Sequence, residues 1–538
     1  MRKPFLSLLI TLCFLCASLG ASAVEYAPSS VLSQGRWVKI RVAQTGIYKL
    51  TFAELQKMGF ANPAAVSVYG YGGWPLDEDF RQPYADDLPQ AAVYKGADYL
   101  LFYGRGPVKW SYSTSLATFV HENNPYSSYG YYFLSDTSPV KTLAKETSVT
   151  GASLQVNTYD DYFVHEKDQV SVNKSGRELF GESFSLNTGQ TFPFAVPGIT
   201  DDPAKISFRF IAKPTTGQAL VILTAGTQPL LNASIPRSSI DDSYTKALEL
   251  SRTVSWNGAK TPDVQVGITY SRNTNDLAHL DYIRLHAVRT LKMYGPYTFF
   301  RSIASVGNVT RFVLQEASAN VKIWDVTNPV LPVEMETTLN GTECSFTIPA
   351  SNTLREFVAV DISKTLPAPE TVGVVSNQNL HALEQTDMVI LTHPAFMEQA
   401  ERLAALHRSE SGLKVTVVTP EPVYNEFSSG TPDATAYRRL MKMFYDRGKQ
   451  AGTAPRYLLL FGDGTFDNRM ITSEWKNLTN LNLLLTYQSK ESLNMYTYVT
   501  DDYFGFLDDS EGANLSGDKL DIGIGRFPVR TLEEAKIA

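Results

Sequence analysis

Hydrophobic and polar residues alternate in short runs through the first two thirds of the chain, the pattern of half-buried β-strands. The alternation is clearest between residues 161 and 289, in the runs KISFRFIAK, ALVILTAG, VQVGITYS and DYIRLHAVR. These runs end in polar turns, so we predict a β-sandwich or jelly-roll domain there. Shorter, glycine-punctuated runs nearer the N-terminus predict further β-rich structure, with one helix that begins at a capping box formed by Thr51 and Glu54.

The pattern changes near Met388. The continuous apolar runs MVILT, KVTVV and YLLLF predict strands that are covered on both faces. Apolar residues recur at helical spacing between them, with Gly412 expected to end the first helix and Asp433 to cap the second. The stretch YNEFSSGTP between these helices is interpreted as a long loop. Alternating strands and helices predict a parallel, doubly wound sheet.

The patterns divide the chain into five segments. They are a signal peptide (1–23), an N-terminal β-rich domain (24–150), a β-sandwich or jelly-roll domain (151–292), a small β domain with the linker LPAPETVGVV (293–375), and an α/β domain (376–538). Several domains are expected because 538 residues exceed what one hydrophobic core usually serves.

The N-terminus carries an export signal. Arg2 and Lys3 precede the apolar run LSLLITLCFLCASLG, and the A-x-A sequence at residues 21–23 is a cleavage site, so these residues are expected to be removed on export. The net charge of -7, without a basic run, argues against a nucleic-acid partner.

Cys344 is the one cysteine outside the signal peptide, which excludes an internal disulfide in the exported chain. It lies in TECSFTI, where it shares a face of a predicted strand with Phe346. We interpret it as a small buried hydrophobic residue rather than a nucleophile.

Two aspartates follow the predicted strand in RYLLLFGDGTFDNR, residues 456–469. A phosphate loop is excluded there, because the lysine and the spacing of a Walker motif are missing. Asp463 and Asp467 lie where ligands bind in α/β sheets, which favours a cation or nucleophilic role. An aspartate after a buried strand more often anchors a turn, and we favour this structural interpretation.

The segment TDDYFGFLDDSEG is the richest in acidic residues. Asp501, Asp502, Asp508 and Asp509 are candidate calcium ligands, accompanied by Glu511. The spacing of an EF-hand is absent, and a solvated acidic loop is the alternative. A metal-dependent hydrolase that uses these acids together with Asp463 and Asp467 is the least favoured function.

The histidines do not predict a zinc site. His121-Glu122 and His165-Glu166 each begin like a zinc-peptidase motif but lack its second histidine. His279 and His286 are seven positions apart in one strand, so alternation predicts opposite faces. The chain contains no G-x-S-x-G sequence, which leaves serine hydrolase chemistry without an anchor.

Four blocks of the α/β segment resemble the gingipain family of cysteine peptidases: VYNEFSSGTPDATAYRRLMKMFYDRG, RYLLLFGDGTFDNR, TDDYFGFLDD and LDIGIGRFPVRTLEEA. Within this family the resemblance is to the cell-surface sortases of the type IX secretion system of Bacteroidetes. The blocks SVYGYGGWPLDED, DYLLFYGRGP and NPYSSYGYYFLS are similar to the leading region of those sortases.

The resemblance implies a caspase-like α/β fold with a cysteine nucleophile and a histidine. It implies a sortase at the outer membrane and cell surface that removes C-terminal sorting domains from secreted cargo and transfers the cargo to a surface lipopolysaccharide. The implied partners are those cargo proteins, outer-membrane secretion components and the lipopolysaccharide. No cofactor is required, and calcium remains a candidate.

The family's catalytic histidine and cysteine lie downstream of a block that here spans Ile524 to Pro528. The α/β segment contains no cysteine, and His393 and His407 match no catalytic position of the family. We therefore assign no catalytic residue, expect the catalytic pair beyond Ala538, and interpret the chain as an inactive N-terminal fragment. The alternative is a non-catalytic surface protein whose β-sandwich binds glycan or a secretion partner.

Overall fold

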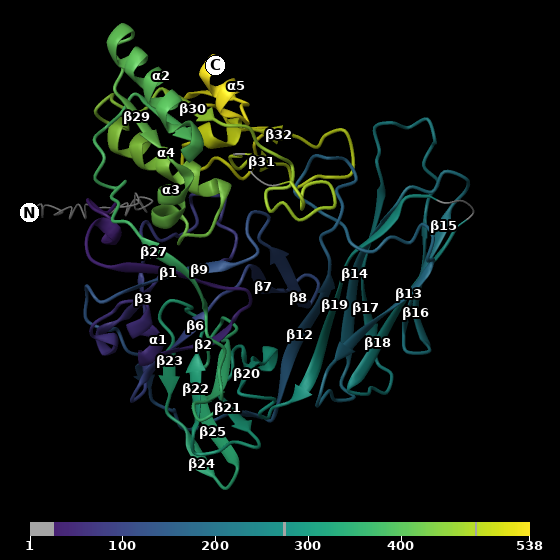
Figure 1. The fold of residues 1–538 in the computed structure, drawn as a ribbon. Helices are drawn as coiled ribbons and strands as arrows, with labels where there is room; N and C mark the ends of the chain where they lie inside the picture. Colours follow the sequence, from purple (N-terminus) through teal and green to yellow (C-terminus); the bar gives the residue numbers. More distant parts are fainter. Residues whose placement is uncertain (1–25, 273–275, 479–480, 482) are drawn as a thin grey trace, which may run out of the picture.

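The computed structural model describes residues 26–272, 276–478, 481 and 483–538, so the predicted signal peptide lies outside the described residues. Strands outnumber helices along this chain and form several sheets, and the longer helices gather in the C-terminal part (Figure 1). The prediction of β-rich modules followed by an α/β domain with a parallel sheet is confirmed.

The N-terminal module contains two sheets and a hairpin. The five-stranded sheet has the order β27 (Glu370–Val375), β1 (Trp37–Val42), β9 (Gly130–Ser135), β3 (Ser67–Tyr69), β4 (Gln90–Ala91). The three-stranded sheet has the order β2 (Gly46–Thr51), β6 (Tyr99–Gly104), β5 (Tyr94–Lys95), and the hairpin pairs β7 (Val108–Ser113) with β8 (Thr118–Asn123). Helix α1 (Phe52–Lys57) begins at the predicted capping box of Thr51 and Glu54.

Strand β27 corrects the expected linker. Part of LPAPETVGVV forms this strand, which pairs antiparallel with β1 and places Trp37 opposite Val375. Its valines favour a strand, and the free edge of β1 supplies the hydrogen-bond partners that isolated backbone lacks. The chain thus returns to the N-terminal module before it enters the α/β domain.

The predicted β-sandwich is confirmed as two four-stranded antiparallel sheets. One has the order β12 (Thr158–Glu166), β19 (Ala278–Thr290), β14 (Ala204–Ala212), β17 (Leu248–Trp256), and the other β13 (Gly189–Ala195), β18 (Asp263–Ser271), β15 (Ala219–Ala225), β16 (Gln228–Ile235). Their inner faces share one core, which includes Phe208, Val266 and Leu285. Alternation along the strands supplies these inner residues, as the sequence pattern predicts.

His279 and His286 do not lie on opposite faces of β19. The pairing of β19 with β14 skips Asp281: Phe210 pairs with Leu280, and the next residue back, Arg209, pairs with Tyr282. Such a bulge adds one residue to one strand and resets its alternation. Leu280 and Ile283 both face the core, and both histidines lie on the other face.

The small β module also has two sheets. Their orders are β10 (Ala144–Glu146), β23 (Val333–Met335), β22 (Val321–Asp325), β26 (Phe357–Asp361), β20 (Tyr297–Phe300), and β11 (Leu154–Val156), β21 (Thr310–Leu314), β25 (Glu343–Ile348), β24 (Thr338–Asn340). Strands β10 and β11 come from residues before the sandwich and pair in parallel with β23 and β21. The sandwich is therefore an insertion between strands of this module.

The α/β domain is built on a four-stranded parallel sheet. Its order is β29 (Val415–Val418), β28 (Met388–Thr392), β30 (Tyr457–Phe461), β33 (Gly523–Phe527). The helices are α2 (Met397–Glu410), α3 (Pro420–Phe427), α4 (Ala434–Lys449) and α5 (Leu532–Ile537), and a short pair joins β31 (Tyr487–Gln488) to β32 (Val499–Thr500). The three predicted strands, the stop at Gly412 and the cap at Asp433 are confirmed.

Helix α3 corrects the expected long loop, since it includes the YNEF part of YNEFSSGTP. Pro420 occupies the first helical turn, where its missing N–H removes no hydrogen bond. Val423 and Phe427 are four residues apart on one face and pack into the core beside the sheet.

Successive residues of the central strands face different helices. Val389 and Leu458 point to the layer that contains α3 and α4, whereas Ile390 and Leu459 point to the layer that contains α2 and α5. Strand β33 ends the sheet, and within the described residues its outer side has no neighbouring strand. No helix in the described part of the chain has the length and apolar character needed to cross a membrane.

Candidate functional site

The carboxyl ends of the parallel strands form the edge where α/β proteins bind ligands. His393 follows β28, Asp463 follows β30 and Arg530 follows β33. The guanidinium of Arg530 donates from Nε to Asp463 Oδ2 at 2.5 Å, and the backbone N–H of Gly464 donates to Asp463 Oδ1 at 2.8 Å. Asp463 therefore joins the loops that follow two strands of the sheet.

His393 serves a local role at this edge. Its Nδ1 accepts the backbone N–H of Ala395 at 3.2 Å and so caps the short turn that precedes α2. Partial burial lowers the pKa of the His393 imidazole, so the neutral ring that accepts this hydrogen bond is favoured at neutral pH.

Asp467 is buried and holds a turn. Its Oδ2 accepts the backbone N–H groups of Ile471 and Thr472 at 2.8 and 2.7 Å. An aspartate that accepts two backbone donors beyond itself stabilises the loop after the strand. This geometry supports the structural interpretation of Asp467 over a nucleophilic or metal-binding role.

The four candidate calcium ligands do not form one group. Asp501 accepts both Nε and Nη2 of Arg526 on β33, at 2.8 and 2.7 Å. Asp509 pairs with Lys442 at 2.6 Å, and the Asp502 residue is exposed at the start of a short turn. Asp501 and Asp509 are thus paired with cations and Asp502 is solvated. This arrangement agrees with the alternative interpretation, an acidic loop that binds no calcium.

Asp508 does lie beside other acids. Among the described residues, the one group of acidic, histidine or cysteine side chains close enough to hold a metal consists of Asp508, Glu511 and Asp521. Protein donors already occupy these carboxylates: Lys449 donates to Asp508 at 2.5 Å, and Tyr445 Oη donates to Asp521 at 2.9 Å. These contacts fasten the loop to α4, and an acidic group with such partners is not evidence of a metal site.

Cys344 lies on β25 in the core of the small β module, with 2% of its surface exposed. Burial raises the pKa of its thiol, which disfavours the thiolate that a nucleophile requires. The structural interpretation of this cysteine is confirmed.

Three histidines outside the α/β domain pair with carboxylates. His121 Nε2 contacts Glu166. The contact joins the histidine of the His121-Glu122 sequence to the glutamate of the His165-Glu166 sequence. They line a charged cavity of about 270 Å³ at the edge of the sandwich. His165 pairs with Glu182, and His286 with Asp160.

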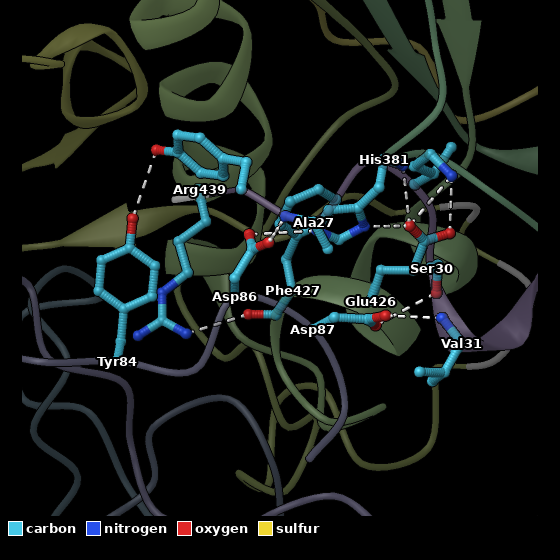
Figure 2. A network of polar contacts seen from close by, with 12 residues as sticks. Ala27, Ser30, Val31, Tyr84, Asp86, Asp87, His381, Glu426, Phe427 and Arg439 are labelled. Atoms are coloured by element: carbon cyan, nitrogen blue, oxygen red, sulfur yellow. Dashed lines mark hydrogen bonds and ion pairs between the residues drawn. The ribbon is translucent and has the colours of Figure 1, made fainter. Parts of the chain in front are cut away.

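A buried polar network joins the α/β domain to the N-terminal module (Figure 2). The His381 imidazole lies between two carboxylates: its Nδ1 is 2.6 Å from Glu426 on α3, and its Nε2 is 3.1 Å from Asp86. Glu426 also accepts the backbone N–H of Leu380 at 2.8 Å, and Asp86 accepts that of Ala27 at 2.6 Å. Sequence reasoning missed this network, because no local motif links positions 86, 381 and 426.

The charge of His381 decides what the network can do. Burial alone would lower the pKa of the imidazole, but hydrogen bonds and attraction from Asp86 and Glu426 outweigh it and raise the pKa to about 9. A buried imidazolium with both nitrogens occupied has no lone pair with which to accept a proton from a substrate. The network is therefore an interdomain contact rather than a catalytic dyad.

Beside it, Arg439 on α4 donates to the backbone carbonyl of Phe427 at 3.2 Å and lies over the ring of Tyr84, 4.3 Å from its centroid (Figure 2). The next acidic residue, Asp87, accepts the backbone N–H of Val31 at 2.7 Å. These contacts extend the polar interface on both sides of His381.

Comparison with known proteins places the α/β domain in a family. Residues 381–538 match the profile of Peptidase family C25. Among solved structures, dimeric latent PorU from Porphyromonas gingivalis is similar with a TM-score of 0.88 and 35% sequence identity, over 95% of this chain and 49% of that chain. The chain thus spans about half the length of that PorU structure. No match was found among curated proteins.

A weaker likeness is to the CBM36-1 domain of a multidomain xylanase from the hindgut metagenome of Trinervitermes trinervoides, with a TM-score of 0.16 and 12% identity over 23% of this chain and 96% of that chain. A likeness at this level supports no conclusion about the sandwich. The C25 match and the PorU similarity agree with the four sequence blocks in the α/β segment. Residues 381–538 are thus a domain of peptidase family C25, the gingipain family of cysteine peptidases.

Proposed function

We propose that this chain forms the N-terminal modules and the first part of the peptidase domain of a type IX secretion sortase. The enzyme removes C-terminal sorting domains from exported cargo and transfers the cargo to a surface lipopolysaccharide. The observation that carries this proposal is the similarity to PorU along nearly the whole chain, together with the C25 match.

The described residues supply the scaffold of this reaction. In cysteine peptidase chemistry a thiolate attacks a peptide carbonyl, an imidazole moves the proton, and an acyl-enzyme passes to water or to an amine. Cys344 is buried and His381 is held between two carboxylates, so neither fits these roles. We assign the nucleophile and base to a part of the sortase that this chain does not span, since the chain covers 49% of the PorU structure. The reaction uses only side chains and requires no cofactor.

The proposed location is the outer membrane and cell surface, and the proposed partners are cargo proteins, outer-membrane secretion components and lipopolysaccharide. The N-terminal pattern of basic residues, apolar run and A-x-A sequence supports export. N-terminal sequencing of the protein from surface fractions should begin at Val24.

The activity is tested by comparing the 538-residue chain with the same chain extended along its reading frame. The substrate is a reporter protein fused to a C-terminal sorting domain. We expect cleavage by the extended form, loss of cleavage after alkylation with iodoacetamide, and no cleavage by the 538-residue chain. Cleavage that survives alkylation, or an extended form without any cysteine-dependent activity, would contradict the proposal.

A further inference from the structure

A cavity of about 920 Å³ lies where the N-terminal module, the β7–β8 hairpin, the sandwich and the small β module meet. Three strands that line it are edge or hairpin strands: β7, β12 and β20. Its volume lies within the range of small-molecule binding sites. The C25 domain contributes nothing to its lining, so the cavity is separate from the peptidase site.

Aromatic side chains dominate its walls, and most of them have a polar edge. The lining includes Trp74, Tyr103, Trp110, Tyr112, Tyr159, Tyr162, Phe163, Tyr294, Tyr297 and Phe299. Trp110 stacks on Tyr162 with ring centroids 4.2 Å apart, and Tyr297 contacts Phe299 edge to face at 5.6 Å. All four of these rings are half-buried and line the cavity, and Tyr297 and Phe299 also pack against the neighbouring core.

The floor of the cavity carries four charged side chains whose charges sum to zero. Arg289 pairs with Asp161 at 2.5 Å, and Arg301 pairs with Glu356 at 2.8 Å. These two pairs are the charged side chains of the lining, and 1% of the Arg301 side chain is exposed. Because each guanidinium already has a carboxylate partner, the cavity offers no unbalanced charge to a phosphate or carboxylate ligand. The Glu356 side chain, 31% of which is exposed, can accept hydrogen bonds from hydroxyl groups.

The cavity opens at a rim of small polar residues. Thr114, Thr327, Asn352 and Thr353 line it and are exposed. A ligand can therefore enter between the β7–β8 hairpin and the loop before β26 without passing the C25 domain.

We propose that this cavity binds a neutral oligosaccharide. Pyranose rings have an apolar C–H face that packs on an aromatic ring, and hydroxyl groups around the ring that bond to paired carboxylates and guanidiniums. The cavity combines both kinds of surface, with no net charge. A purely apolar ligand would cover the Glu356 side chain, 31% of which is exposed, without offering it a hydrogen bond, and is disfavoured.

This inference does not depend on the proposed sortase activity. It also differs from a glycan site on the sandwich alone, since β7 and β20 lie outside the sandwich and supply four of the ten aromatic residues of the lining. If no sugar binds but the extended enzyme cleaves its substrate, only the cavity proposal fails. If sugar binds but the extended enzyme does not cleave, only the sortase proposal fails.

The test is isothermal titration calorimetry of the whole chain with maltotriose, cellotriose, mannotriose, galactotriose and N-acetylchitotriose. Titration to about 10 mM detects dissociation constants in the millimolar range. We expect at least one trisaccharide to bind, and Trp110→Ala and Tyr297→Ala each to weaken that binding about tenfold or more. The matched control is Tyr496→Ala, which removes a tyrosine that is 76% exposed outside the cavity and should leave binding unchanged.

Thermal melting shows whether each variant folds. If Trp110→Ala does not fold, the binding measured with Tyr297→Ala tests the proposal. A capped peptide of alternating tyrosine and serine serves as the competing ligand class. The proposal is overturned if no trisaccharide binds, if binding survives in both cavity variants, or if the peptide binds and the sugars do not.

Discussion

His381 and Glu426 form a fully buried pair across the start of the α/β domain, with Nδ1 and Oε2 2.6 Å apart. The pair connects the segment before β28 to helix α3, and Asp86 extends it to the N-terminal module. Three polar side chains from distant positions thus hold the peptidase domain against the module that precedes it.

Replacing one partner should cost much stability, because it leaves the other charge buried and unpaired. We expect His381→Gln to lower the free energy of unfolding by about 3–5 kcal/mol, as measured by urea denaturation near pH 7. His407→Gln is the matched control, because His407 is partly exposed on α2 and should change stability by less than about 0.5 kcal/mol. Equal effects of the two substitutions would show that the buried pair contributes nothing.

The same pair predicts a pH dependence. The pKa of His381 is raised to about 9 in the folded protein, above the value of about 6.5 expected when the chain is unfolded. The folded state therefore binds the proton more tightly, so this contribution to stability is complete below about pH 6.5 and is lost as the pH rises through about 9. Urea midpoints measured across this range should fall in the native protein, and the fall should be smaller in His381→Gln.

Asp463 and Asp467 should respond differently to substitution. Asp467→Ala removes the acceptor of two backbone N–H groups and should lower the free energy of unfolding by about 1–3 kcal/mol. Asp463→Asn weakens a contact with Arg530, whose side chain is 47% exposed, and should cost less than about 1 kcal/mol. Loss of cleavage by the extended enzyme carrying Asp463→Asn, with stability unchanged, would instead assign Asp463 a chemical role.

Calcium should not stabilise the acidic loop. The carboxylates of Asp508 and Asp521 already accept hydrogen bonds from Lys449 and Tyr445, and Asp501 is paired with Arg526. We expect the melting temperature in EDTA and after addition of calcium chloride to agree within about 1 °C, since a ligand that binds the folded state would raise it. A calcium-dependent rise that Asp521→Asn abolishes would establish a metal site at this loop.

Cys344 should react slowly with thiol reagents. Its thiol is buried and the pKa of that thiol is raised, so a reagent such as DTNB should label it only after denaturation with urea. In the same assay on the chain that begins at Val24, which lacks Cys13 and Cys16, Cys344→Ser should abolish labelling in both states. Rapid labelling of the native protein would contradict the buried position on β25.

Local features could be predicted from the sequence because they depend on residues a few positions apart. Alternation predicts the sandwich strands, and the capping box of Thr51 and Glu54 starts α1 where expected. The continuous apolar run at Met388–Thr392 predicts a strand with helices on both faces. Each of these signals reflects backbone hydrogen bonding and burial that one segment specifies by itself.

Errors arose where a distant segment decides the outcome. Edge pairing with β1 turned the expected linker into β27, and contact with the core made the expected loop into α3. One bulged residue, Asp281, placed His279 and His286 on the same face. The candidate site changed for the same reason, since Asp501 meets Arg526 and Asp508 meets Lys449 only in the folded chain.

The sequence by itself therefore determined the order and type of the main elements and the family blocks, because period, capping and motif are properties of neighbouring residues. Only the tertiary structure decided the position of β28 in the centre of its sheet, the contact of Asp86 with His381 and the aromatic cavity between four parts of the chain. The last two features depend on side chains hundreds of positions apart, whose proximity is set by the packing of whole modules and leaves no local pattern.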